Sequence, residues 1–237
     1  MRRCKPARML VVLASALLAA ACAPRAASDA PELNLQAPLP PVAAQYRTRI
    51  VRGGAEQIVE WRFWRAPDRL VSENLTARTA EEWQREGATL FLKRAFHEDR
   101  RGIEYQMDDL RIAGELPQWT RQALLLDPQV LAALTLRRGL LEGNTRHRRY
   151  VGEFGGSRWD VTLHIEQRLP VRIERRRDGI IERTELVALH ALAAAPWQPT
   201  PTDTYPFIDY ADLGDMESDP FVQKVHRLLG HAPGHAH

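Results

Sequence analysis

Four histidines fall within the last twelve residues of the sequence, where their imidazoles suggest a site for zinc, copper or nickel. They are His226, His231, His235 and His237. Three of the four lie in a Gly- and Pro-rich end that does not preorganise a metal site. We therefore predict no bound metal.

An acidic string fills residues 208–220, and calcium prefers oxygen ligands of this kind. Its acidic members are Asp209, Asp212, Asp215, Glu217 and Asp219. Counted from Asp209, however, Ala211 and Leu213 occupy the third and fifth ligand positions of an EF-hand loop. The string is therefore interpreted as a solvated or docking segment.

No nucleophile is marked by its sequence neighbours. Gly155-Gly156-Ser157 lacks the Gly-x-Ser-x-Gly spacing of a nucleophile elbow. The remaining histidines have no serine, cysteine or acid placed locally for catalysis; they are His97, His147, His164 and His190. Because triads assemble across a fold, a hydrolase stays open as an alternative. The leading prediction is a protein that is not an enzyme and uses no cofactor.

Cys22 is the residue whose setting indicates a specific covalent chemistry. A positively charged start precedes thirteen uncharged residues, Met9 to Ala21, a run too short to span a bilayer. Leu18-Ala19-Ala20-Ala21 leads directly into Cys22 and resembles the bacterial lipobox. The resemblance implies a signal peptide over 1–21 and a triacylated Cys22 carrying fatty acids such as palmitate. The alternative is an ordinary signal peptide cut nearby, with Cys22 an incidental thiol.

Removal of the leader changes the charge of the protein. The 33 basic and 30 acidic residues become 29 and 30, a net charge of −1, because four basic residues and no acidic ones leave. A nucleic-acid partner is therefore not expected. Ala23 follows the cysteine in place of an Asp, which by resemblance to lipoprotein sorting implies the outer membrane, with the protein facing the periplasm.

The rest of the chain divides by composition into three parts. Residues 22–44 contain five prolines and no sustained hydrophobic period, which is typical of an extended tether. Residues 45–195 have the size of one domain with a single core. Residues 196–237 form a Pro-rich arm, with a short helix after Asp219-Pro220 and a His-containing tail.

Period-two alternation of apolar and polar residues recurs through 45–195 and predicts antiparallel strands with one buried face. Two segments interrupt it. Thr79 and Glu82 fit a capping box before Gly87, which predicts a short helix over 79–86. Residues 117–134 predict two short helices separated at Asp127-Pro128. We expect an α+β fold, a strongly curved antiparallel sheet (half-barrel) with short helices on its concave face.

This arrangement resembles the LolA/LolB superfamily of bacterial lipoprotein carriers and receptors. The likeness is carried by 57–70, with its strand followed by Pro67, and by 150–175, with Trp159-Asp160-Val161 and Leu169-Pro170-Val171. It implies a bent sheet half-wrapped around an apolar space that helices plug. A lipid-anchored member matches the receptor branch better than the soluble carrier.

The same resemblance implies that an acyl chain of a lipid or lipoprotein binds on the concave face. Burial alone contributes about 0.8 kcal/mol per methylene, so no polar motif is required. The expected apolar trough is lined by Trp61, Phe63, Tyr105, Leu131, Trp159 and Leu163. The alternative is that these residues fill a closed core.

Two further surfaces are open to interpretation. The arm and its acidic string would serve, in an alternative function, as the docking strip of an interaction subunit in an envelope protein complex. Arginines at 146–149 and 172–177 are suited to anionic headgroups or a protein partner. Interleaved glutamates favour a different interpretation, cross-strand ion pairs on the wet face.

Overall fold

A computed structural model describes residues 33–35, 37–112, 118–137 and 146–231. The predicted signal peptide, Cys22, His235 and His237 lie outside these residues. The described residues belong to one compact unit, Pro31–His237. Within them, no helix combines the length and the apolar character that crossing a membrane requires.

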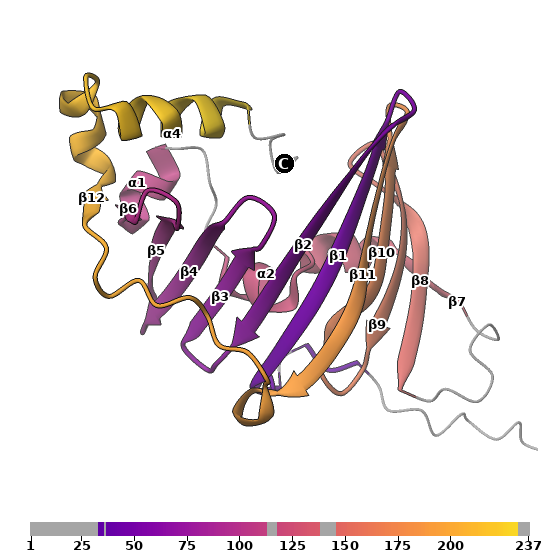
Figure 1. The fold of residues 1–237 in the computed structure, drawn as a ribbon. Coiled ribbons are helices and arrows are strands. Elements are labelled where there is room, and N and C mark those ends of the chain that lie inside the picture. The colour runs from indigo at the N-terminus through magenta and orange to yellow at the C-terminus, as the bar shows by residue number, and fades with distance from the viewer. Residues whose placement is uncertain (1–32, 36, 113–117, 138–145, 232–237) are drawn as a thin grey trace, which may run out of the picture. The chain divides into compact units, whose positions relative to one another are not determined.

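Among the described residues, twelve strands form one sheet in the order β12-β6-β5-β4-β3-β2-β1-β11-β10-β9-β8-β7 (Figure 1). Neighbouring strands run antiparallel, except that β12 is parallel to β6. The strands are β1 Val42–Arg52, β2 Ala55–Arg65, β3 Arg69–Asn74, β4 Thr79–Glu86, β5 Thr89–Phe96, β6 Arg101–Tyr105, β7 Thr135–Arg137, β8 His147–Phe154, β9 Ser157–His164, β10 Leu169–Arg177, β11 Ile180–Ala191 and β12 Phe207–Asp209.

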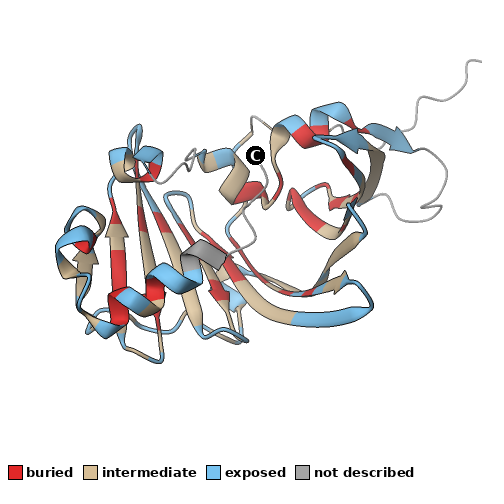
Figure 2. Ribbon diagram, turned by 90° about the horizontal axis from the view of Figure 1, so that it is seen from above, coloured by how far each residue is buried: buried red, intermediate tan, exposed pale blue. Residues whose placement is uncertain are grey.

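The helices are short. They are α1 Met107–Ile112, α2 Trp119–Leu124, α3 Pro128–Ala133, α4 Pro220–His231 and the 3-10 helices η1 Leu192–Ala194 and η2 Tyr210–Met216. An open, curved sheet with few short helices confirms the predicted α+β half-barrel (Figures 1 and 2).

The inner face of the sheet, which the helices cover, follows from the period-two pattern. Residues paired across strands point to the same face. Tyr46 pairs with Trp61, and their rings stack with centroids 4.5 Å apart. Phe63, two residues further on, lies on the same face and is buried. The main core collects here; among its buried members are Val42, Tyr46, Phe63, Leu70, Leu92, Ile103, Tyr105, Leu110 and Phe221.

The prediction of a helix over 79–86 is wrong, because these residues form β4. A capping box describes only local hydrogen bonding, whereas this segment gains partners on both sides. Glu82 binds Arg69 on β3, and Glu81 binds Arg94 on β5. Trp83 is buried on the inner face, and Gly87, with φ of 62°, serves the β4–β5 turn rather than a helix end.

The two helices expected within 117–134 are confirmed. The Asp127 side chain accepts a hydrogen bond from the backbone N–H of Gln129 at 2.7 Å, and Pro128 opens α3. The helix expected after Asp219-Pro220 is also confirmed, and it extends to His231. β6 ends at Tyr105, and α1 follows it.

Residues 196–206, here called the strap, cross the outer face of the sheet. Trp197 packs with Trp64, a buried outer-face residue of β2, and Thr200 donates a hydrogen bond to Glu73 on β3. The acidic string then takes structural roles. Asp209 caps η2 by accepting from the N–H of Ala211, and Asp219 pairs with Arg101 at 2.8 Å.

Under the strap, a buried histidine predicts a dependence of stability on pH. His97 lies 3.4 Å from the Glu73 carboxylate. Burial lowers the pKa of His97 below its usual value near 6.5, against a smaller raising effect of Glu73. The unfolded chain therefore takes up this proton first as pH falls, so stability is present above about pH 6.5 and decreases below it.

We expect the thermal midpoint to be lower at pH 5.5 than at pH 7.5, and His97→Gln to reduce that difference. Burial also lowers the pKa values of His147 and His164, so part of the dependence should persist in the variant. His226→Gln, on the exposed side of α4, is the control. An equal pH response in all three proteins would contradict the role of His97.

Candidate functional site

A second apolar group lies where α3 meets the far half of the sheet. It consists of Leu126, Val130, Leu131, Leu134, Val161 and Leu163 and is called the α3 cluster. Gly152 on β8 permits the close approach of α3, because a Cβ there would lie 3.1 Å from the Leu134 side chain. Trp159 and Ile173 on the neighbouring strands pack at its border.

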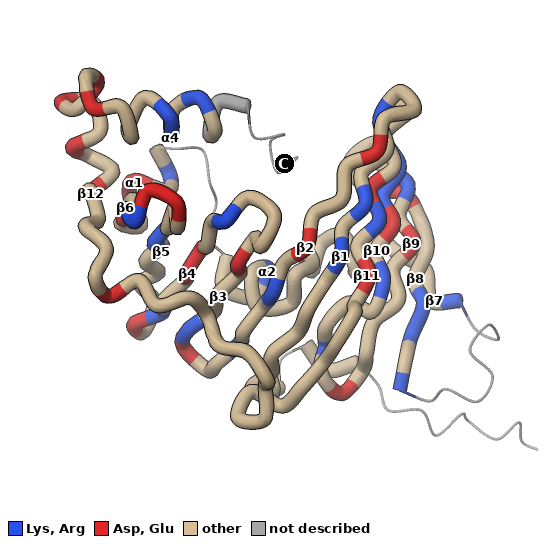
Figure 3. The backbone as a smooth tube through the Cα atoms, viewed as in Figure 1, with Lys and Arg blue, Asp and Glu red and all other residues tan. Residues whose placement is uncertain are grey.

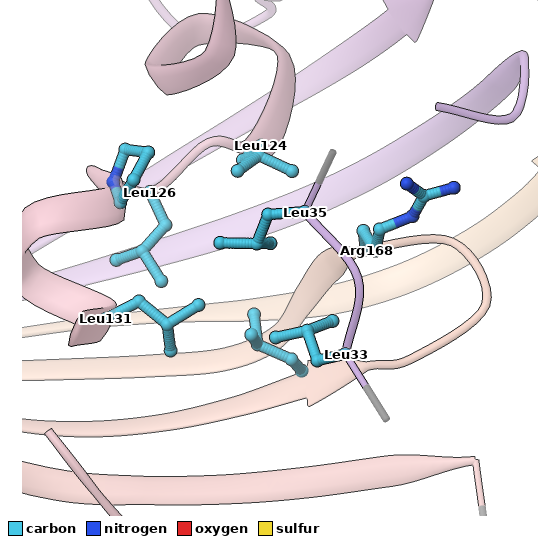
Figure 4. Close-up of a pocket in the computed structure, with 8 residues that line it drawn as sticks. Leu33, Leu35, Leu124, Leu126, Leu131 and Arg168 are labelled. Atoms are coloured by element: carbon cyan, nitrogen blue, oxygen red, sulfur yellow. The ribbon is translucent and has the colours of Figure 1, made fainter. Parts of the chain in front are cut away.

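A small cavity of about 10 Å³ lies beside the α3 cluster and is called the leucine pocket. Its lining is Leu33, Leu35, Leu124, Leu126, Pro128, Leu131, Leu163 and Arg168. Figure 4 shows Leu33 and Leu35 entering from a separate segment and pointing toward the leucines of the helical region. The chain's own residues before β1 therefore fill most of this apolar space.

Arg168 holds that segment in place. Its guanidinium donates to the backbone carbonyls of Asn34 at 3.0 Å, Ala37 at 2.5 Å and Pro38 at 2.5 Å. Leu33 and Leu35 thus lie in the pocket while the chain around them is bound through carbonyl oxygens. Among residues 33–40, proline supplies acceptors without N–H donors, which suits capture by a guanidinium.

Arg65 connects the same region to the sheet and to α2. It is 1% exposed and donates to the carbonyls of Pro40 at 3.1 Å, Ala123 at 2.7 Å and Gln167 at 2.5 Å. Burial lowers the pKa of Arg65 to about 10, so it stays charged at neutral pH. Three segments distant in sequence therefore meet at one cation.

The six residues predicted to line a trough fall into two groups. Phe63, Tyr105 and the half-buried Trp61 belong to the main core, and Leu131, Leu163 and the half-buried Trp159 belong to the α3 cluster. Phe63 and Tyr105 are 2% and 0% exposed, as expected if they fill a closed core. Leu131 and Leu163 line the leucine pocket, and they are the part of the predicted set that the structure brings together.

Comparison with known proteins gives no sequence match: no family model and no curated protein matches this chain. Solved structures to which it is similar include PNGF-II, at 10% identity and a TM-score of 0.38 over 76% of this chain. The chain spans about a third of that protein (33%).

Two smaller structures are covered almost whole. They are the LolA superfamily protein NE2245 from Nitrosomonas europaea and a Vibrio parahaemolyticus domain assigned to outer membrane lipoprotein sorting. Each is 8% identical with a TM-score of 0.33; the matches cover 70% and 69% of this chain and 90% and 89% of theirs. The LolA superfamily that the sequence resembles is thus among the structural likenesses. Because both TM-scores are below 0.5, these likenesses give no information on function, which has to be inferred from the residues of this chain.

No group of three or more His, Cys, Asp or Glu within the described residues is placed to hold a metal ion. Four residues of this site were not predicted from the sequence. Leu33 and Leu35 fill the leucine pocket, and Arg65 and Arg168 bind the chain segment that carries them. Their signal was a pair of leucines within a proline-rich stretch, together with arginines next to apolar strands.

Proposed function

We propose that the leucine pocket binds an acyl chain of a lipid or lipoprotein, and that Leu33 and Leu35 leave the pocket when the ligand enters. The observation that carries this proposal is the nature of the present occupant. Two leucines from a segment without helix or strand lie in a site lined by four further leucines and a proline. An aliphatic chain presents the same chemistry and gains about 0.8 kcal/mol per buried methylene.

The way Arg168 holds the chain before β1 is consistent with Leu33 and Leu35 being able to leave the pocket. Arg168 binds Asn34, Ala37 and Pro38 through their backbone carbonyls, so their release costs hydrogen bonds that water replaces in part. The wall of the pocket does not depend on that segment, because α3 packs on β8 and its Val130 and Leu131 share one apolar cluster with Val161 and Leu163 of β9. A ligand therefore needs to displace a short stretch of chain rather than open the sheet.

The proposed setting is the periplasmic side of the outer membrane, with an acylated Cys22 as the anchor. Leu33 is eleven positions after Cys22, and eleven extended residues reach roughly 36–40 Å. The proposed role is one of binding, without catalysis. A ligand that displaces Leu33 and Leu35 would lengthen the free tether and loosen the domain from its anchor.

Leu131→Asn is expected to weaken binding of a fluorescent fatty acid at least about tenfold, since the pocket would then bury an unpaired amide. Leu110→Asn is the matched control, because Leu110 is a buried helical leucine of the main core on α1. It should lower stability similarly and leave affinity unchanged. Binding is measured by fluorescence titration, after thermal melts show that both variants are folded.

Native mass spectrometry of the purified protein adds an independent readout, a co-purifying lipid. A protein that carries no lipid and takes up no fatty-acid probe would overturn the proposal. Equal loss of affinity in Leu131→Asn and Leu110→Asn would place the ligand elsewhere.

A further inference from the structure

Arginines are frequent along β7–β10 (Figure 3), and the pairing register places several of them on the outer face of these strands, opposite the α3 cluster. The pairing register places Asp160 and Glu174 on this face, directly opposite each other. Around these two carboxylates lie the arginines Arg137, Arg149, Arg158, Arg172, Arg176 and Arg183. The same face also carries Glu153, opposite Arg158, and Glu185, opposite Arg172, so six cations and four anions give a local net charge of +2.

The two carboxylates are each fully used by arginine. Arg149 binds Asp160 through two hydrogen bonds of 2.9 and 2.6 Å. Glu174 is only 5% exposed, and it accepts from Arg172 at 2.6 Å, Arg176 at 2.8 Å and Arg183 at 2.6 Å. Burial opposes ionisation of Glu174, yet these arginines lower its pKa to about 2. The two carboxylates therefore hold the bound guanidinium groups in fixed positions, but they do not balance the total positive charge of the surrounding arginines.

The register sets like charges against each other at two places. Arg137 on β7 lies directly opposite Arg149 on β8, and Arg158 on β9 lies directly opposite Arg176 on β10. Like charges in directly opposed cross-strand positions destabilise a sheet. Glu153, the other cross-strand partner of Arg158, is exposed. Within the described residues, the side chains of Arg137 and Arg158 make no ion pair and no hydrogen bond.

These arginines line a cavity. It has a volume of about 390 Å³ and is bordered by Arg137, Arg149, Val151, Arg158, Trp159, Asp160, Glu174 and Arg176. Both like-charged pairs thus border the same half-open hollow. Planar guanidiniums pair with phosphate oxygens through two parallel hydrogen bonds, more specifically than lysine does. An anion with several oxygens would relieve the repulsion in both pairs at once.

We propose that this hollow, the arginine cavity, binds a phosphate-bearing group, with Arg137 and Arg158 as its free ligands and Arg149 and Arg176 as fixed ones. The shared chemistry is a phosphate mono- or diester, which either a free phosphate compound or an anionic lipid headgroup supplies. The site does not depend on the leucine pocket, since it lies on the other face of the sheet.

The test uses the full-length protein and the variant Arg137→Ser/Arg158→Ser. One arm titrates inorganic phosphate by calorimetry at low ionic strength. The other measures co-sedimentation with phosphatidylcholine vesicles, with and without phosphatidylglycerol. The control is Arg52→Ser/Arg177→Ser, which removes two exposed arginines from hairpin ends outside the cavity.

We expect the cavity variant to lose phosphate affinity, or the phosphatidylglycerol-dependent part of vesicle binding, by at least about tenfold. The control should bind like the wild type. The arm that responds identifies the source of the phosphate group. The proposal is overturned if neither probe binds, or if the cavity variant and the control lose the same amount.

Folding of the cavity variant is checked by its thermal midpoint. This should stay equal or rise in the absence of phosphate, because each like-charged pair is removed. Phosphate should raise the midpoint of the wild type and leave that of the variant unchanged. A phosphate-induced rise of equal size in the variant would contradict the assigned ligands.

Discussion

Replacing Arg65 with leucine is expected to lower the free energy of unfolding by about 3 kcal/mol or more. The reason is that three carbonyls, those of Pro40, Ala123 and Gln167, share this one buried donor group. Hydrogen bonds to charged groups contribute about 1.5–3 kcal/mol each, partly offset by the cost of desolvating the cation. Leucine leaves the carbonyls unpaired in a buried site. Urea denaturation followed by far-UV circular dichroism measures the change.

Two further variants test whether the loss of stability comes from the hydrogen bonds of Arg65, from its charge, or from the removal of any arginine. Arg65→Lys keeps the charge but lacks the planar fork that reaches three acceptors, so it should still lose about 2 kcal/mol. Arg47→Leu removes an exposed arginine of the neighbouring strand, ion-paired with Glu60 at 2.7 Å, and should lose less than about 1 kcal/mol. If Arg65→Leu were as mild as Arg47→Leu, Arg65 would not join the three segments as inferred.

The strands of this fold were the most predictable part, because burial on one face imposes a period of two. Trp61 and Phe63 on β2, and Val161 and Leu163 on β9, all face inward as their alternation indicates. The break between α2 and α3 was equally readable. Asp127 and Pro128 act through hydrogen bonds and dihedral preferences within two residues, so no distant partner is involved.

β4 marks the limit of such local signals. Thr79 and Glu82 are well placed to start a helix, and nothing nearby in sequence opposes it. The competing interactions come from Arg69 on β3 and Arg94 on β5, and they exist only once the strands are side by side. Local capping was therefore outweighed by cross-strand pairing and by burial of Trp83.

The leucine pocket was only half predictable for the same reason. Leu131 and Leu163 were identified because apolar residues at helix and strand periods must be buried. Residues 42–44 of the predicted tether belong to β1, whereas Pro38, Pro40 and Pro41 lie in residues without helix or strand. These prolines carried no sign that Arg168, 130 residues after Pro38, would bind carbonyls of this segment. The arginine cavity likewise depends on register, since Arg158 and Arg176 become opposed only when β9 pairs with β10.

Replacing both Leu33 and Leu35 with serine is expected to increase fatty-acid affinity by about tenfold or more. If these leucines occupy the site that the acyl chain enters, they compete with it from within the same chain. Full burial of a leucine contributes about 1.5–3 kcal/mol, and both side chains are partly buried beside the α3 cluster. The serine variant loses this free energy only in the state in which residues 33 and 35 fill the pocket. Even half of the combined burial energy of the two leucines would therefore increase the population of the empty pocket enough to raise fatty-acid affinity tenfold.

Leu39→Ser is the matched control, because Leu39 lies in the same proline-rich stretch but packs against the main core. Fluorescence titration should show unchanged affinity there and tighter binding in Leu33→Ser/Leu35→Ser. Unchanged affinity in the double variant would mean that the ligand enters elsewhere, and weaker binding would make the two leucines part of the ligand's own site. Tighter binding confined to the double variant would identify residues 33–35 as a displaceable occupant, because Leu39→Ser also removes an apolar contact of the same stretch but leaves the leucine pocket filled.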